Sequence, residues 1–595
     1  LFSNGKEQCK TISQKIIGHI KLLLKNEYQF TLVACGGLGR KEQGIFSDID
    51  LLFLSENEKG EKDAREFLKV LWDEGFKIGY SIRNLSNVFE HAKRDITFFT
   101  TIIFTQLIFG NEEEYDNFNR EKKKFFSQNR NLFFKEFYDE TKNLTYFEKE
   151  QILFLNQPYL KSSYGGLRGF QSIKWFLYLY PEHKDFQEKE QFKNAEKGYY
   201  YLWSIRNISS LINKRSIDQF DLKTLSKFLE FIGRKKQYEA EEFLKKIYIS
   251  LSAIFDLILL YKDEIIPQIL PRKKFFKLFR KKSQGSTITV YNKRVYVNEK
   301  DTKSYLNGIL YAVKSGYEIA EVTLYQSQKF LKTKKVFLDD EIEIFKQFFE
   351  LQTGLYHGFY YLHHSGFLSS LFPYYHKTIL RPQLDSYHSF TLDAHTLLTL
   401  KFISQFYRAK KEPMSEILYQ LTFKEKQTLI FALLLHDIGK IHEGSHIENN
   451  KKLIDSILEP LFIDEEQKED ISFLVVEHLI MSHTCNRQDI NRIKVILSFA
   501  EKVGSVKRLN LLYLLTVCDM MAVNNHKLSS FIEANLLTLY LRTKIVLSEK
   551  SNQLLLRNEE KDEIFNAIQS QVKNSIFPLI TYFPEDYLYE VENND

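Results

Sequence analysis

Apolar and polar residues follow a short period near the start of this chain, which predicts strands. Residues 31–35 (TLVAC) form a brief apolar run that predicts a buried strand. Residues 48–54 (DIDLLFL) and 76–83 (FKIGYSIR) predict two further strands, and residues 61–74 predict a helix between them. The pattern up to about residue 115 is therefore α/β.

The rest of the chain has mostly helical periodicity. From about residue 116 onward, apolar residues recur with helical spacing, with one small exception. Residues 287–297 (TITVYNKRVYV) predict a hairpin that turns at Asn292 and Lys293. The basic cluster at residues 272–282 (RKKFFKLFRKK) is interpreted as a solvated linker or helix end. We therefore predict an α+β protein that is mostly helical and has a small mixed sheet.

Composition bears on the number of domains and on the compartment. The chain has 595 residues, 44% of them hydrophobic, which is more than a single core can use. Its net charge of +6 is too small to indicate nucleic-acid binding. Four cysteines without a CxxC pair argue against disulfides or a thiolate zinc site. With no apolar run long enough for a membrane and no signal peptide, we expect a cytoplasmic protein without a membrane partner.

Residues 36–54 (GGLGRKEQGIFSDIDLLFL) carry the first candidate chemistry. Residues i and i+2 of a strand share a face, so Asp48 and Asp50 should project together at the edge of a sheet. Two such carboxylates repel each other unless a cation lies between them. Magnesium prefers oxygen ligands and shares itself between carboxylates and substrate phosphates. We therefore predict that Asp48 and Asp50 are catalytic Mg²⁺ ligands acting on a nucleoside triphosphate.

The residues just before this pair suit the phosphates of that nucleotide. Glycines let the backbone approach a phosphate without a Cβ in the way, and a hydroxyl adds a polar contact. An arginine can balance the triphosphate charge, although Arg40 can also pair with Glu42. The predicted nucleotide-binding residues are Gly36, Gly37, Gly39, Arg40 and Ser47.

The chemistry expected of such a site is two-metal nucleotidyl transfer, which usually needs a third carboxylate. The predicted strand at residues 76–83 offers none. Asp95 follows that strand, and Asp73 and Glu74 precede it, so the choice among these three stays open.

A second set of candidate ligands lies in the helical C-terminal half. His436 and Asp437 are adjacent in LLLHDIGK, and imidazoles and carboxylates suit divalent transition metals. A metal held by such residues can activate water for attack on phosphorus, and Lys440 is a nearby catalytic cation for the phosphate. The order H…HD…H…H…D on helices is the signature of the HD phosphohydrolase superfamily. The predicted ligands are His395, His436, Asp437, His446, His478 and Asp519, of which His446 and His478 fit a two-metal version.

Further segments extend these two motifs into one family resemblance. They are GGLGRKEQGIFSDIDLL, KSSYGGLRGFQSIKW (161–175), SYHSFTLDAHTL, LLLHDIGK, EHLIMSHTCNRQDI, LNLLYLLTVCDMMAV and FPEDYL (583–588). From about residue 30 to the end, the chain resembles the bifunctional PII uridylyltransferase/uridylyl-removing enzymes. This family transfers UMP from UTP to a tyrosine of PII, a nitrogen-signalling protein, and its HD domain hydrolyses the UMP–tyrosine bond.

The resemblance implies a function, cofactors and a domain division. Asp48 and Asp50 would hold Mg²⁺ for transfer, and the HD ligands would hold Mn²⁺, Fe²⁺ or Mg²⁺ for hydrolysis. The implied segments are a polymerase-β-like nucleotidyltransferase domain (1–115), a helical uridylyltransferase-associated domain (116–270), a linker hairpin with helices (271–385), an all-α HD domain (386–545), and a C-terminal helix and tail (546–595).

The sequence also departs from the family pattern. Gly169 stands where the family's GGLRD segment has an aspartate, and Ser162 and Gln157 replace acidic residues nearby. The family's two glutamine-sensing ACT domains do not follow the HD segment in this sequence, so no glutamine response is expected. The departures keep two alternatives open, namely an HD phosphodiesterase with a degenerate transferase domain and a non-catalytic module that binds a nucleotide or a partner. Further replacements are Tyr80 for histidine, Ala394 for glutamate and Ser445 for aspartate.

Overall fold

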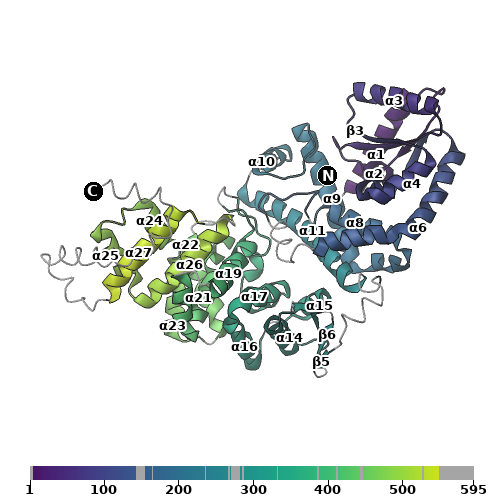
Figure 1. Ribbon diagram of the computed structural model, residues 1–595. Coiled ribbons are helices and arrows are strands. Elements are labelled where there is room, and N and C mark those ends of the chain that lie inside the picture. Colours follow the sequence, from purple (N-terminus) through teal and green to yellow (C-terminus); the bar gives the residue numbers. More distant parts are fainter. Residues whose placement is uncertain are drawn as a thin grey trace, which may run out of the picture. The chain divides into compact units, whose positions relative to one another are not determined.

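The computed structural model divides the chain into two compact units (Figure 1). The first contains Leu1–Leu278 and Leu380–Thr391, and the second contains Phe279–Ile379 and Leu392–Asp595. The structure describes residues 4–548, except 143–154, 164, 235, 266–268, 270–281, 285–286, 292, 332, 335, 385–387, 410–412, 443–445, 462 and 525–527. Most of the basic cluster, the residue Asn292, the FPEDYL segment and nearly all of the predicted C-terminal tail lie outside the described residues.

A small mixed sheet opens the first unit. Its order is β3-β2-β1-β4, with β2 parallel to β3 and β1 antiparallel to both β2 and β4. The strands are β1 (Thr31–Ala34), β2 (Ile49–Leu54), β3 (Ile78–Arg83) and β4 (Gln106–Phe109). The three predicted strands are confirmed, with one difference that concerns the site. Strand β2 begins at Ile49 and lies inside the sheet, so Asp48 precedes the strand instead of standing at a sheet edge.

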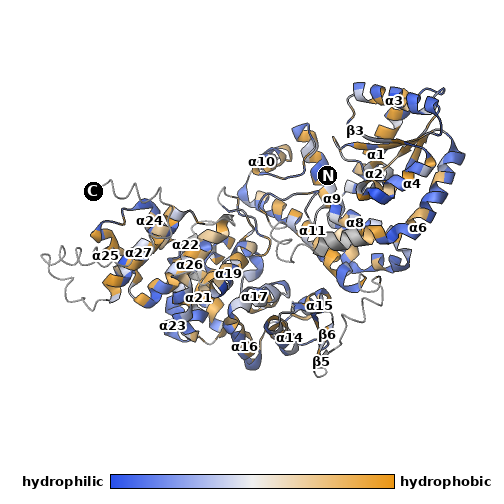
Figure 2. Ribbon diagram, in the orientation of Figure 1, coloured by the Kyte–Doolittle hydropathy of each residue, from blue (hydrophilic) through white to orange (hydrophobic). Residues whose placement is uncertain are grey.

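Two helices bury the apolar residues of this sheet. Helix α1 (Gly5–Leu23) contributes Ile17 and Ile20, and α3 (Glu58–Asp73) contributes Phe67 and Leu71 to one core with residues of β1 and β2. Helix α3 begins where the Asn57 side chain accepts a hydrogen bond from a backbone N–H. Hydrophilic and hydrophobic residues alternate along α3 in Figure 2, as an amphipathic helix requires.

Helices continue the first unit and build the walls of its site. Helix α9 (Glu190–Asn213) packs on α11 (Gln237–Glu264) and on α1. At Gly198 of α9, a Cβ would lie 3.0 Å from the Ser250 backbone, so glycine permits the close approach of the two helices. The remaining helices are α2 (Gly36–Gly39), α4 (Leu85–Arg94), α5 (Ile96–Thr101), α6 (Glu112–Lys142), α8 (Leu167–Leu179) and α10 (Leu222–Phe231), with a 3₁₀ segment at Pro181–Glu188.

The second unit begins with another small sheet. Strands β6 (Ile288–Tyr291) and β7 (Arg294–Val297) pair antiparallel, which confirms the predicted hairpin. The edge strands β5 (Lys282–Gln284) and β8 (Glu318–Ile319) were not predicted, because segments this short carry no clear alternation. The helices that follow are α14 (Thr302–Ser315), α15 (Glu321–Leu331), α16 (Asp339–Lys346), α17 (Leu355–His364) and α18 (Phe367–Leu371).

A helical bundle completes the second unit. Helices α19, α21 and α26 pack against one another, and α22 packs on α23 (Figure 1). The bundle contains α19 (Leu392–Ala409), α20 (Met414–Gln420), α21 (Phe423–Leu435), α22 (His446–Leu458), α23 (Glu465–Val476), α24 (Ile480–Arg487), α25 (Ile493–Val503), α26 (Val506–Asn524) and α27 (Ser530–Ser548). The predicted fold class, mostly helical with a small mixed sheet, is thus confirmed. Among the residues that the structure describes, no helix is both long and apolar enough to cross a bilayer.

The sheet core of the first unit makes a stability prediction. Phe53 of β2 is fully buried in the core to which α1 and α3 contribute, so Phe53→Ala should lower the free energy of unfolding by about 3–5 kcal/mol. The matched control is Phe231→Ala, since that side chain is 57% exposed and its loss should cost less than about 0.5 kcal/mol. Urea unfolding of both variants measures the difference. Equal losses would contradict the assignment of Phe53 to the core.

Candidate functional site

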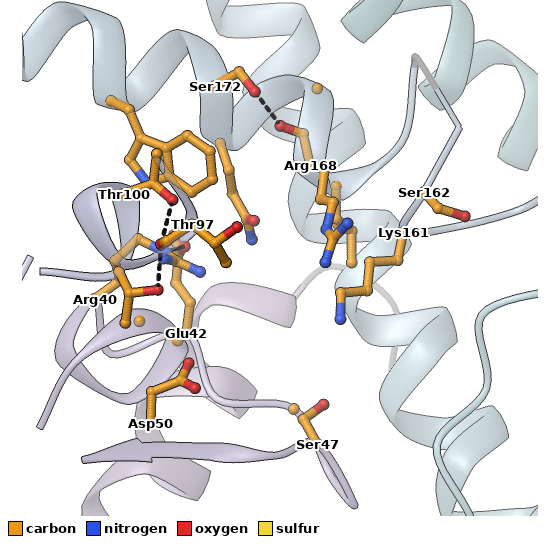
Figure 3. A pocket seen from close by; sticks show the side chains of 18 of the residues that line it. Arg40, Glu42, Ser47, Asp50, Thr97, Thr100, Lys161, Ser162, Arg168 and Ser172 are labelled. Atoms are coloured by element: carbon orange, nitrogen blue, oxygen red, sulfur yellow. Dashed lines mark hydrogen bonds and ion pairs between the residues drawn. The ribbon is translucent and has the colours of Figure 1, made fainter. Parts of the chain in front are cut away.

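A cavity of about 680 Å³ opens beside the sheet of the first unit (Figure 3). Its volume is typical of a site for a small molecule. In Figure 3, Asp50 and Ser47 lie on one side, and Lys161 and Arg168 reach toward them from the other. Its polar lining includes Gly36, Gly37, Arg40, Glu42, Gln43, Ser47, Asp48, Asp50, Thr97, Thr100, Lys161, Ser162, Arg168, Gln171, Ser172 and Arg206.

The two predicted aspartates both line this cavity. Asp50 is partly buried near the start of β2, and Asp48 is exposed in the loop before it. Burial raises the pKa of Asp50, and the charge of Asp48 raises it further while Arg40 opposes the change. A divalent cation between the carboxylates would offset both the cost of burying the charge of Asp50 and its repulsion by Asp48. The donor set therefore fits magnesium.

The glycines of the turn have different roles. Gly36 has a φ of +53°, and a Cβ there would lie 2.1 Å from Asp50 Oδ2, so only glycine fits against that carboxylate. Gly37 lines the cavity. Gly39 does not line it; a Cβ at Gly39 would lie 2.3 Å from the Phe104 carbonyl oxygen. Close packing against that backbone, not a phosphate, explains the third glycine.

Helix α9 and one glutamine hold the loop that carries Asp48. The Gln43 side chain donates to the carbonyl oxygens of Ser47 and Asp48 at 3.1 and 2.9 Å. From α9, Arg206 donates to the Ser47 hydroxyl at 3.0 Å, and Asn207 accepts from the Ile45 amide at 3.1 Å. The predicted contact residue Ser47 is therefore also a hydrogen-bond partner of a buried arginine. These contacts fix the shape of the loop before any ligand arrives.

Three cations that the sequence-based predictions missed also face the cavity. Lys161, Arg168 and Arg206 come from the loop before α8, from α8 itself and from α9. Burial lowers the pKa of Lys161, and the neighbouring arginines lower it further. Asp218 accepts from the Lys161 amide and from the Ser162 hydroxyl, both at 2.7 Å, which holds this loop in place. Together with Arg40, these cations suit a polyphosphate.

None of the three candidates for a third carboxylate lines the cavity. Asp95 caps α5 by accepting from two backbone amides, and Glu74 lies 3.0 Å from His19. Asp73 ends α3. Of the described residues that line the cavity, only Asp48, Asp50 and Glu42 carry carboxylates. Gly169 lines the cavity at the position where the family pattern has an aspartate.

The second site is a buried cluster of histidines and aspartates in the helical bundle. His395 Nε2 lies 3.0 Å from Asp519 Oδ1 and 3.2 Å from His436 Nε2. Asp437 Oδ2 lies 3.4 Å from His436 Nε2, and Asp437 Oδ1 lies 3.8 Å from His478 Nε2. Helices α19 and α26 supply His395 and Asp519, and the segments after α21 and α23 supply the rest. Five predicted ligands thus converge.

The hydrogen bonds on the far side of two rings fix their tautomers. His436 Nδ1 lies 3.0 Å from the Leu433 carbonyl oxygen, and His478 Nδ1 lies 2.8 Å from that of Val475. A carbonyl oxygen can only accept, so each Nδ1 carries a proton, and in the neutral form of each ring the lone pair is on Nε2. Lone pairs and carboxylates directed at one another fit a divalent cation, and outer hydrogen bonds of this kind orient metal ligands.

Electrostatics favour the metal-binding protonation states of Asp437, His395 and His478. Burial lowers the pKa of His436, but the neighbouring carboxylate of Asp437 outweighs this and raises it, so a metal would have to displace a proton from His436. Burial opposes ionisation of Asp437, but Lys440 and His436 outweigh it and hold the pKa of Asp437 well below its usual range. Lys440 Nζ lies 2.8 Å from Asp437 Oδ2. Burial lowers the pKa of His395, and it lowers the pKa of His478 to about 4. Both imidazoles are therefore neutral and able to bind a cation at neutral pH.

Asn450 is a further site residue, and sequence reasoning missed it. This buried side chain donates to the carbonyl oxygens of His436 and Val475, at 2.6 and 3.2 Å, and accepts from the Gly439 amide. It therefore joins the backbone segments that carry two of the imidazoles. The sixth predicted ligand, His446, begins α22, and its side chain lies outside the part of the chain that the structure describes.

The bundle and its cluster match a known family. Residues 392–505 match the HD domain. This HD domain holds four of the five converging ligands, and Asp519 follows on α26. Its histidines and aspartates agree with divalent metal binding.

The whole chain is also similar to curated proteins named "Bifunctional uridylyltransferase/uridylyl-removing enzyme". The protein from Pseudomonas aeruginosa is 27% identical over 93% of this chain and 64% of its own length. The protein from Hydrogenovibrio crunogenus is 26% identical over 93% of this chain and 65% of its own length. The protein from Pasteurella multocida is 25% identical over 99% of this chain and 71% of its own length. The chain thus resembles these enzymes along almost all of its length, but spans less than two thirds of the first two.

The buried cluster of His395, His436, Asp437, His478 and Asp519, called the HD cluster below, predicts a loss of metal on substitution. His436→Ala removes the most central imidazole, so protein loaded with Mn²⁺ and then desalted should lose about one ion per chain by elemental analysis. His483→Ala is the matched control, because His483 is exposed in the same domain. Equal metal content in the two variants would rule out His436 as a ligand.

The contact between Gly36 and Asp50 makes a second prediction for the site. Gly36→Ala should push the Asp50 carboxylate aside and weaken the binding of magnesium to this cavity by about tenfold or more, as for a lost charge-assisted contact. Gly18→Ala in α1 is the control, since a Cβ there meets nothing within 4 Å. Titration calorimetry measures both. Unchanged affinity for Gly36→Ala would mean that Asp50 does not hold the cation.

Proposed function

We propose that this protein transfers UMP from UTP to a tyrosine of a PII-type signalling protein and removes it again by hydrolysis. The observation that supports the proposal is that one chain combines two groups of side chains that could each hold a cation. One combines Asp48 and Asp50 with a cavity rich in cations, and the other is the HD cluster. The similarity to bifunctional uridylyltransferase/uridylyl-removing enzymes along 93% of the chain supports both activities.

In the transfer step, the tyrosine hydroxyl loses its proton to solvent, its oxygen forms a bond to the α-phosphorus of UTP, and the bond from that phosphorus to pyrophosphate breaks. Asp48 and Asp50 would hold Mg²⁺, which supplies positive charge at the reacting phosphate. The cations Arg40, Lys161 and Arg168 would neutralise the triphosphate and the leaving pyrophosphate. The Gly36–Gly37 turn lets the backbone approach the phosphates.

In the removal step, water attacks the phosphorus of the UMP–tyrosine ester and the tyrosine leaves. His395, His436, Asp437, His478 and Asp519 would hold a divalent ion, either Mn²⁺, Fe²⁺ or Mg²⁺, that supplies the Lewis acidity for this step. Lys440 lies at the rim of the cluster with its ammonium beside Asp437. Its charge would attract the phosphodiester and offset the negative charge that develops on it.

A second candidate function rests on one residue of the cavity. Gly169 lines it and offers no carboxylate where the family pattern has one. If that carboxylate is needed for transfer, the protein is an HD phosphodiesterase that removes UMP from PII without adding it.

Intact mass spectrometry of a PII-type protein separates the two candidates. The wild-type chain with Mg²⁺ and UTP should add one UMP, and with Mn²⁺ and no UTP it should remove UMP from protein modified beforehand. The variant Asp48→Asn/Asp50→Asn should lose only addition, and His436→Ala should lose only removal. Removal without addition by the wild type would select the phosphodiesterase, and the absence of both would refute the proposal.

A further inference from the structure

Glu42 is a buried carboxylate of the nucleotide cavity that the proposed chemistry does not use. It is 4% exposed and lies in the loop after α2. Its oxygens contact side chains from three parts of the first unit. Oε2 lies 3.1 Å from Arg40 Nε, Oε1 lies 2.6 Å from Lys174 Nζ on α8, and Oε2 accepts from the Tyr199 hydroxyl on α9 at 2.6 Å.

These contacts distinguish Glu42 from the two aspartates. Burial raises its pKa, but Lys174 and Arg40 outweigh that effect and lower it, so Glu42 is ionised. Both of its oxygens already have cationic or hydroxyl partners. Binding a metal would require breaking the contacts with those partners. We therefore do not assign Glu42 as the third carboxylate.

Among the three partners of Glu42, Arg40 is the one that lines the cavity. Its guanidinium lies 5.9 Å from the centre of the Trp175 ring. Figure 3 shows it beside Glu42, across the cavity from Lys161 and Arg168. A long arginine side chain has many rotamers, and holding one of them before the ligand binds lowers the entropy cost of binding. The carboxylate of Glu42 and the Trp175 ring together hold it.

We propose that Glu42 is a positioning residue for nucleotide binding, because it orients Arg40 toward the phosphates. The inference rests on the proposed function, since it requires a nucleoside triphosphate in this cavity. It assigns Lys174 and Tyr199 a different task, which is to hold Glu42 itself and join the loop to α8 and α9.

Charge and position predict opposite results when Glu42 is neutralised. Glu42→Gln removes one negative charge from the cavity, and long-range attraction alone would then tighten the binding of a triphosphate. Loss of the orientation of Arg40 would instead weaken binding. The sign of the change therefore separates a positioning residue from a mere counter-charge.

The test is titration calorimetry of the full chain with magnesium and the non-reactive analogue uridine 5′-[α,β-imido]triphosphate. Glu42→Gln should bind about tenfold more weakly than the wild type, the usual effect of losing a hydrogen bond to a charged group. Arg40→Met should weaken binding at least as much. The double variant should be no weaker than Arg40→Met alone, because Glu42 acts through Arg40. Equal or tighter binding by Glu42→Gln, or additive losses in the double variant, would overturn the inference.

Two controls separate position from fold stability. Phe53→Ala lowers the stability of the sheet core, but Phe53 is not among the contacts of Glu42, so this variant should lower the melting temperature but change the affinity less than about twofold. Glu42→Asp keeps the charge and shifts the carboxylate by one methylene, which tests the inference if Glu42→Gln does not fold. It should also bind more weakly, and wild-type affinity would overturn the inference. A wild type that binds no nucleotide would instead refute the proposed transferase.

Discussion

Repulsion between neighbouring carboxylates is the constraint around which both sites are built. In the first unit, Asp48 and Asp50 face one cavity, and burial already raises the pKa of Asp50. In the second, Asp437 and Asp519 lie within reach of the same imidazole of His395. Neither arrangement is favourable without positive charge, so the fold has to supply cations or leave room for metal ions.

Buried polar side chains around the two sites hold the charged groups in place. Gln43 and Asn207 satisfy the backbone of the loop that carries Asp48. Asn450 does the same for the turn after His436. Because these amides are buried and hydrogen-bonded, they resist rearrangement when ligands come and go. Neutral side chains therefore contribute, together with Arg206, to the preorganisation of the two sites.

Spacing in the sequence was enough to predict which residues meet when they are close together along the chain. The two aspartates are two positions apart, and His436 and Asp437 are neighbours, so elementary geometry predicts their meeting. The more distant ligands His395, His478 and Asp519 were found only through the order of the motif. Lys161 and Arg206 were missed because a cation on a helix or loop has no distinguishing pattern, and only the packing of α9 places Arg206 beside Ser47. Asn450 was missed for the same reason, since a buried asparagine resembles any other in sequence.

The hydrogen bonds of Arg206 have a consequence for how this chain can be divided. Arg206 is 2% exposed and joins Ser47 to Ser216 by donating to both hydroxyls, at 3.0 and 2.8 Å. The sheet and its aspartates belong to the first 115 residues by sequence pattern, yet their loop takes its shape from side chains of α9, with 159 positions between Ser47 and Arg206. The shape of the loop that carries Asp48 therefore depends on contacts from outside the α/β segment. A fragment that ends near residue 115 would lack the α8 and α9 side chains that line the cavity, so a truncated protein should not keep the shape of that cavity.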